Sequence, residues 1–416
     1  MDIKFERFTL ENGLKVIFHE DLATPMVAFN ILYDVGAKDE DPEHTGFAHL
    51  FEHLMFGGSV NIPVFDEPLQ MAGGENNAYT TNDFTNYFIQ LPAENIETAF
   101  WLESDRMLAL GFNEESLRVQ KKVVIEEFKE SYLSKPYGDV WQHLRTLAYK
   151  VHPYQWMTIG KNLEQIEQVN LEEVKSFFLK HYRPENAIIC VAGKTTLEEV
   201  KSLSEKWFSN IPQGARYKRN IAKEPKQTEA RFLEIEADVP VDALYKAWHI
   251  DDRWSDEYYA SDLLSEILGN GNSSRFYQNL VKEKQIFSAI ECYQTGSIDP
   301  GLFVIEGRLA KNITLEQANI AVEKELEELL ENGITAIEIE KAKNKIEAQI
   351  VFEDMNLLAR ANNLAFYEML GDAKDMNSEL ERYNKINSDN LNRSAKNIFD
   401  KSNCNTLFYR KKEKTT

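Results

Sequence analysis

The segment 45–58 constrains the fold of this chain more than any other stretch of the sequence. It runs TGFAHLFEHLMFGG, and His49, Glu52 and His53 interrupt an otherwise apolar run. A threonine at its start can cap a helix, and two glycines suit the end of one. Burying two histidines and a glutamate in so apolar a helix is costly unless another group satisfies them. The segment therefore predicts a packed helix whose polar residues have a partner.

The spacing of these polar residues indicates what the partner is. His49 and His53 are four residues apart, which places both imidazoles on one face of a helix, one turn apart. Neutral imidazole is a good zinc ligand, and catalytic zinc normally has three protein ligands and one open position. Glu52 projects near the same site and can take the proton of a zinc-bound water, whose pKa the metal lowers to about 7. The alternative is an amphipathic helix with two histidines on its polar face.

The remaining histidines do not add to this set. Five of them lack a partner at ligand spacing, and we interpret them as surface or hydrogen-bonded structural residues: His19, His44, His143, His181 and His249. The predicted zinc site therefore still needs a third ligand.

Composition excludes several classes of protein. The formal net charge is −21, which makes nucleic acid a poor partner because binding it requires Lys and Arg to neutralise phosphates. No apolar stretch approaches the roughly 20 residues that span a bilayer. The first residues lack the apolar core of a signal peptide, so we expect a cytoplasmic protein, or a periplasmic one if a signal was removed. Three scattered cysteines fit buried apolar residues better than disulfides.

The chain length of 416 residues favours two or three domains. A polar, basic stretch with turn-forming residues separates two halves and predicts a linker at 212–230 between domains 1–211 and 231–416. Asn12-Gly13 between β-prone runs predicts a hairpin with a type I′ turn. The other predicted elements are strands at 27–33, 77–80, 86–89, 232–235 and 243–248, and helices at 96–109, 114–132 and 258–268.

The two halves resemble each other weakly. When Leu263–Ile267 is laid on His49–His53, Glu266 falls on Glu52, aliphatic residues replace both histidines, and glycines follow in each half. A duplication in which only the first copy kept metal ligands would produce this pattern. We therefore expect a second domain without a metal site.

His49-Leu50-Phe51-Glu52-His53 matches the inverted zinc motif of the inverzincins. The chain resembles the pitrilysin-type (insulinase-type) metallopeptidases, in the half-length class of the mitochondrial processing peptidase and its bacterial relatives. The resemblance runs nearly end to end and includes the stretches 9–14, 46–58, 74–80, 123–127, 152–154 and 182–186.

The resemblance implies the third ligand. In the family this ligand is the last residue of a Val-aliphatic-aliphatic-x-Glu run, which here is Glu127, 74 positions after His53. Glu126 is the alternative. Gln120 stands where the family often has a second, supporting glutamate, and Gln keeps the hydrogen bonding but loses the charge.

The resemblance also exposes a departure. Active family members hold the substrate carbonyl with an Arg and a Tyr from the second half, and here Val281 and Ser288 stand at those positions. This implies that a homologous partner supplies the pair in a heterodimer, with a homodimer as the alternative.

Pattern and resemblance together predict an α+β fold of two related domains, each an antiparallel-rich sheet with helices packed on one side. The predicted activity is that of a zinc metalloendopeptidase, with one Zn²⁺ per chain, acting on peptides or unfolded segments; an acidic interior would favour basic ones. Substrate would add a strand beside Asn77, Ala78, Tyr79 and Thr80. The alternative is a non-catalytic peptide-binding or assembly subunit of the same fold.

Overall fold

The computed structural model describes residues 2–111, 113–214 and 217–413, and the chain divides into two compact units. Unit 1 consists of Met1–Glu130, Trp156–Ile221 and Ile350–Ser378, and unit 2 of Ser131–Gln155, Ala222–Gln349 and Glu379–Thr416. This division differs from the predicted continuous domains because each half of the chain contributes one segment to the other unit. Residues 215 and 216 of the predicted linker lie outside the described residues.

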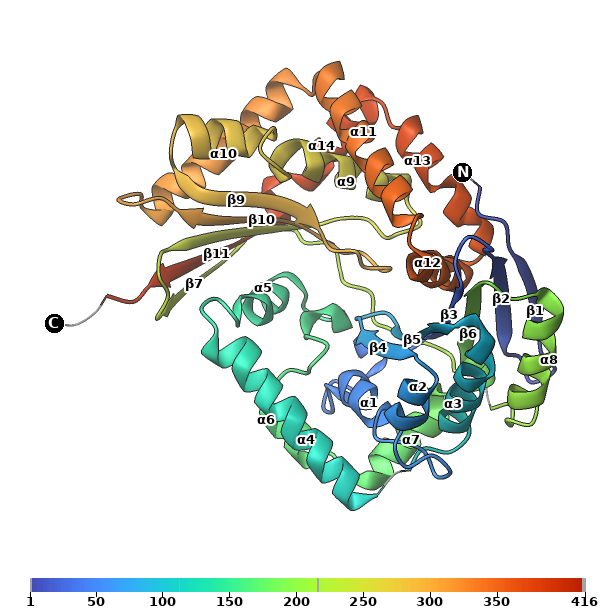
Figure 1. Ribbon diagram of the computed structural model, residues 1–416. Helices are drawn as coiled ribbons and strands as arrows, with labels where there is room; N and C mark the ends of the chain where they lie inside the picture. Colours follow the sequence, from blue (N-terminus) through green and yellow to red (C-terminus); the bar gives the residue numbers. More distant parts are fainter. Residues whose placement is uncertain (1, 112, 215–216, 414–416) are drawn as a thin grey trace. The chain divides into compact units, whose positions relative to one another are not determined.

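Unit 1 is built on a six-stranded sheet (Figure 1). Its strands are β1 (Glu6–Thr9), β2 (Lys15–Glu20), β3 (Met26–Tyr33), β4 (Glu75–Thr80), β5 (Thr85–Pro92) and β6 (Ala187–Gly193). Their order is β1-β2-β6-β3-β5-β4, and all neighbours are antiparallel except β2 and β6. Strand β4 therefore forms one edge of the sheet, next to β5.

The predicted hairpin at the start of the chain is confirmed, but its turn is not type I′. Strands β1 and β2 pair antiparallel. The backbone N–H of Leu10 donates a hydrogen bond to the carbonyl oxygen of Leu14, with three residues between them. Gly13 has a positive φ of 89°, and Asn12 does not. The amide of Asn12 instead donates to the carbonyl oxygens of Phe208 and Ile211, so a tertiary contact sets the turn.

Helices cover both faces of the unit 1 sheet. On one face the ring of Phe29 in β3 packs edge-on against Phe100 of α3, 4.9 Å between centroids. On the other face Leu364 of α12 packs in one cluster with Leu32 and Cys190. The helices of this unit are α1 (Phe47–Met55), α2 (Asp66–Met71), α3 (Ile96–Leu108), α4 (Glu114–Phe128), α6 (Leu163–Gln168), α7 (Leu171–His181), α8 (Leu197–Phe208) and α12 (Leu357–Leu370).

Unit 2 has a five-stranded sheet in the order β7-β11-β8-β10-β9. Its strands are β7 (Arg231–Ala237), β8 (Ala243–His249), β9 (Phe287–Gln294), β10 (Leu302–Leu309) and β11 (Cys404–Lys411). Leu144 of α5 packs with Tyr245 and Val304 on one face, while Trp248 contacts Phe399 on the other. Its helices are α5 (Val140–Ala148), α9 (Asp256–Gly269), α10 (Leu315–Asn332), α13 (Glu379–Lys385) and α14 (Ser388–Ile398); α11 (Ala336–Glu353) runs across the boundary between the units.

The two sheets share one topology, apart from the extra strand β1. In each, a parallel pair (β2 with β6, β7 with β11) is followed by three antiparallel neighbours, and α1 and α9 occupy equivalent places in the chain order. Each half also gives one helix to the other unit, since α5 packs on the unit 2 sheet and α12 on the unit 1 sheet. The predicted α+β class with two related sheets is confirmed. The prediction that helices pack on one side only is wrong for both sheets, because α12 covers a second face of the first sheet and α5 a second face of the other. No helix among the described residues is long and apolar enough to cross a bilayer.

Candidate metal centre

The predicted helix exists as α1, and it buries every residue except the three polar ones. Phe47, Ala48, Leu50, Phe51, Leu54 and Met55 are buried, whereas His49, Glu52 and His53 are partly exposed. The apolar residues anchor the helix in the core of unit 1, which fixes the direction of the polar stripe. His49, Glu52 and His53 therefore lie on one partly exposed stripe of the helix, as their i, i+3, i+4 spacing predicted.

The start of α1 differs from the expectation. Gly46, not Thr45, is the N-cap residue, with a φ of 92° that favours glycine, and a Cβ there would lie 2.7 Å from the carbonyl oxygen of Ile159. Thr45 instead accepts a hydrogen bond from the backbone N–H of Lys161. The 159–161 loop packs closely against Gly46 and binds Thr45, which explains why the N-cap lies one residue later than predicted.

The N–H groups at the start of α1 are satisfied by a residue that sequence reasoning missed. The buried carboxylate of Glu40 accepts from the N–H of Gly46 at 3.0 Å and of Ala48 at 2.8 Å. Burial raises the pKa of Glu40 to about 8, while the two N–H donors act in the opposite direction. No local sequence pattern marks Glu40, because its partners lie six and eight positions further along the chain.

The structure brings His49, His53 and Glu127 together, with one donor atom of each within 4.8 Å of the others. The carboxylate of Glu127, on α4, places Oε2 3.3 Å from Nε2 of His53 and Oε1 3.7 Å from Nε2 of His49. No other such group of three metal-binding side chains occurs among the described residues. Glu126 points elsewhere: it is exposed and pairs with Lys129 at 2.8 Å.

The electrostatics of this cluster suit a metal cation. Burial, and then the neighbouring His53, lower the pKa of His49 to about 4, so its imidazole is neutral near pH 7. Nδ1 of His49 is buried and makes no hydrogen bond within the described residues. Two imidazole nitrogens and one carboxylate oxygen are a donor set that zinc accepts, and they leave a fourth position open. The residues present therefore fit zinc.

Glu52 lies beside this cluster but outside it. Its Oε2 accepts a hydrogen bond of 2.6 Å from the hydroxyl of Thr80. Burial raises the pKa of Glu52, while Thr80 and His53 act against that rise. Glu52 is therefore fixed by Thr80 and is not one of the three clustered donors. A carboxylate in this position, with a raised pKa, is suited to accept and return a proton.

The four predicted substrate-contact residues all lie on the edge strand β4. Asn77 and Tyr79 are exposed, whereas Ala78 and Thr80 alternate with them and are half-buried. In unit 2, Val281 lies in a π-helical turn (Tyr277–Glu283), and the exposed Ser288 donates its hydroxyl to the carbonyl oxygen of Arg308 at 3.1 Å. Neither position offers the guanidinium or phenol expected from the resemblance.

Two sequence models of one peptidase family match the chain. The model described as "Insulinase (Peptidase family M16)" matches residues 15–161, and "Peptidase M16 inactive domain" matches residues 168–346. The chain is 28% identical over 412 residues to "Zinc protease PqqE" of Helicobacter pylori, covering 97% of this chain and 92% of that protein. It is 23% identical to the "Probable mitochondrial-processing peptidase subunit beta, mitochondrial" of Arabidopsis thaliana, over 82% of this chain and 66% of that one.

The crystal structure of a protease from Helicobacter pylori superimposes with a TM-score of 0.92 at 28% identity, covering 98% of this chain and 99% of that one. Fold, motif and relatives agree on a protein of the zinc-protease class. The chain belongs to the insulinase (M16) peptidase family, and its relatives include half-length zinc proteases.

Proposed function

We propose that this chain is a zinc metalloendopeptidase and the catalytic subunit of a heterodimer. The observation that carries the proposal is the convergence of His49, His53 and Glu127 from two helices, with Glu52 next to them on α1. His49, His53 and Glu127 would hold one zinc ion per chain. Zinc bound there supplies Lewis acidity, which polarises a carbonyl oxygen and lowers the pKa of water to about 7.

The residues of this chain have separate tasks in the proposed reaction. Glu52 accepts the proton of the attacking water and then returns it to the departing amine. Burial raises the pKa of Glu52, which makes its carboxylate a stronger base than a solvent-exposed glutamate. The neutral imidazole of His49 is available as a ligand without first losing a proton.

Substrate would bind as an additional strand along β4. That strand pairs with β5 on one side only, so one side of its backbone is available for main-chain hydrogen bonds. Main-chain pairing of this kind gives affinity with little dependence on side chains, which fits peptides or unfolded segments. The exposed residues Asn77 and Tyr79 would contact substrate side chains.

The proposal of a partner rests on Val281 and Ser288. A donor directed at the developing oxyanion commonly contributes about 10²–10³ in rate, and neither residue can act as the family's Arg or Tyr does. A homologous chain would supply the pair. The relative from Arabidopsis thaliana is itself named as a subunit, which agrees with such an arrangement. A homodimer, the alternative, would lack this pair, because both copies carry Val281 and Ser288.

The test is to purify the chain with any homologous chain encoded beside it, and to measure zinc content and peptide cleavage. We expect one zinc per chain and cleavage that a chelator abolishes, with little activity from either chain alone. Zinc without cleavage by any combination would indicate a peptide-binding or assembly subunit. Full activity of this chain by itself would contradict the heterodimer and leave the peptidase proposal standing.

A further inference from the structure

The hydroxyl of Thr80 holds the carboxylate of Glu52. Thr80 is the last residue of β4, and its Oγ1 donates to Oε2 of Glu52 at 2.6 Å. The backbone N–H of Thr80 also acts on this carboxylate, and among the described residues no other side chain donates a hydrogen bond to it. The side chain of Thr80 lies on the half-buried face of β4, so it is directed toward α1 while the backbone of the edge strand remains available.

Such a bond matters because a glutamate side chain has three rotatable bonds. Burying and ordering one costs conformational entropy. A donor that fixes one carboxylate oxygen also fixes the direction of the other, which a general base needs before the proton is transferred. The geometry of Glu52 is thus set before substrate arrives.

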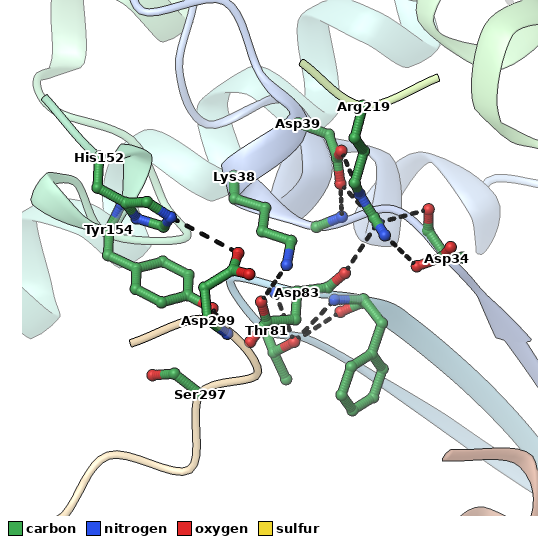
Figure 2. A network of polar contacts seen from close by, with 12 residues as sticks. Asp34, Lys38, Asp39, Thr81, Asp83, His152, Tyr154, Arg219, Ser297 and Asp299 are labelled. Atoms are coloured by element: carbon green, nitrogen blue, oxygen red, sulfur yellow. Dashed lines mark hydrogen bonds and ion pairs between the residues drawn. The ribbon is translucent and has the colours of Figure 1, made fainter. Parts of the chain in front are cut away.

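The segment Lys38–Glu40 contacts both elements that this bond joins, α1 and the end of β4. Glu40 binds the first N–H groups of α1, which carries Glu52. Two residues earlier, Lys38 forms a buried ion pair of 2.7 Å with Asp83, which lies in the turn that follows Thr80 (Figure 2). The backbone N–H of Lys38 also donates to the carbonyl oxygen of Asn82 at 2.8 Å.

The middle residue of the segment is fixed as well. Asp39 is buried and pairs with Arg219 at 2.8 Å (Figure 2). It also accepts a hydrogen bond from the backbone N–H of Gly36. Three consecutive ionisable residues, Lys38 to Glu40, are therefore buried with three different partners: a β-turn, an arginine that follows α8, and a helix N-terminus. Removing one partner of such a buried polar contact is costly, so these contacts hold the segment in place.

We propose that Thr80 is a positioning residue for Glu52, and that the Lys38–Glu40 segment keeps β4 and α1 in the register that their bond requires. This inference rests on the proposed function, since it assigns the support of the general base. In this proposal the hydroxyl of Thr80 binds Glu52 instead of substrate. The substrate strand then pairs with the main chain of β4.

The test compares Thr80→Val, which is isosteric, with Thr80→Ser, which keeps the hydroxyl. In the zinc-loaded chain with its partner, T80V should lower kcat by about 10- to 100-fold with KM and zinc content unchanged. T80S should restore most of the rate. In an E52Q background T80V should cause no further loss, because both changes act through one group. T146V, which removes an exposed hydroxyl on α5, is the control for the substitution type.

A second pair of variants tests the supporting segment. Lys38→Met combined with Asp83→Leu removes the buried ion pair without leaving either charge unpaired, a change that often preserves stability. Thermal unfolding monitors stability separately. The double variant should lower kcat as T80V does, and should add little to T80V.

Crystal structures of the wild type and T80V give a measurement that does not depend on turnover. The Glu52 carboxylate should lie against Thr80 in the first and adopt another rotamer in the second. An unmoved Glu52 with unchanged kcat in T80V would overturn the inference, as would a higher KM with unchanged kcat. If the wild type shows no chelator-sensitive cleavage, the proposed function fails, and the two crystal structures decide the positioning alone.

Discussion

A carboxylate oxygen of Glu127 lies 3.3 Å from Nε2 of His53, although 74 positions of sequence separate the two residues. The contact joins α4 to α1 and completes the only three-residue donor cluster among the described residues. The contact also distinguishes Glu127 from its neighbour Glu126, whose side chain is exposed and pairs with Lys129. The proposed metal chemistry depends on this one tertiary contact.

Glu127→Gln should remove or greatly weaken zinc binding, and Glu126→Gln should change it far less. An amide oxygen is neutral and a poorer ligand than a carboxylate, whereas the Glu126 side chain does not face the cluster. Zinc content after dialysis against a graded chelator would measure both. The two variants are matched in chemistry and differ by one position, so the opposite result would make Glu126 the ligand.

Glu52→Gln should abolish cleavage while zinc remains bound. Losing a general base typically costs about 10²–10⁴ in rate, and Glu52 lies outside the donor cluster. The measurement is kcat together with metal content for the wild type and the variant. Loss of most of the zinc would show that Glu52 is a ligand, and near-normal turnover would show that another group takes the proton.

The stability of the protein should fall in acid partly because of His181. This residue is fully buried between Phe177 and Tyr217, with 4.6 Å between ring centroids on each side, and neither ring nitrogen has a hydrogen bond within the described residues. It is therefore not the surface or hydrogen-bonded histidine that we predicted. Burial lowers the pKa of His181 to about 3.

The sign of the effect follows from this shift. Between pH 6.5 and about 3 the unfolded chain binds a proton that the folded chain excludes, so acid favours unfolding. The slope for one proton is about 1.4 kcal/mol per pH unit. His181→Phe should remove this contribution, so urea unfolding of the zinc-free proteins should show a difference between variant and wild type that grows from pH 6.5 to pH 4. Parallel curves over that range would contradict the assignment.

Cleavage should favour basic peptides and weaken with salt. The net charge is −21, and the exposed carboxylates of Glu75 and Glu126 lie on β4 and α4, the elements that form the edge and the cluster. Electrostatic attraction of this kind typically raises association rates by about 10- to 1,000-fold at low salt and is screened beyond about 8–10 Å near physiological salt.

The comparison uses kcat/KM for matched Lys and Glu peptides across an ionic-strength series. Glu75→Gln should reduce the preference, while Glu198→Gln, an exposed position on α8, should leave it unchanged. Equal rates on both peptides at low salt would contradict the expectation.

Local elements were the most predictable part of this protein. The alternation and apolar runs predicted β3, β4, β5 and α9 at nearly their observed positions, because strands and helices follow the periodicity of their own side chains. The predictions of a type I′ turn and of a Thr45 cap were wrong, because these two conformations depend on distant residues. Asn12 bonds to residues nearly 200 positions away, and Ile159 packs against Gly46, so distant backbone decided two local conformations.

The sequence by itself determined the chemistry on α1: the spacing of His49, Glu52 and His53 on a stripe opposite six buried residues is a property of one helix. Glu127 could be named from sequence only through a family resemblance, because no local pattern tells which of the glutamates on α4 faces α1. The tertiary structure alone decided three further features. Glu40 holds the helix start, Thr80 holds Glu52, and the two halves exchange α5 and α12. Each depends on contacts between residues far apart in the chain, whose partners are set by how whole elements pack.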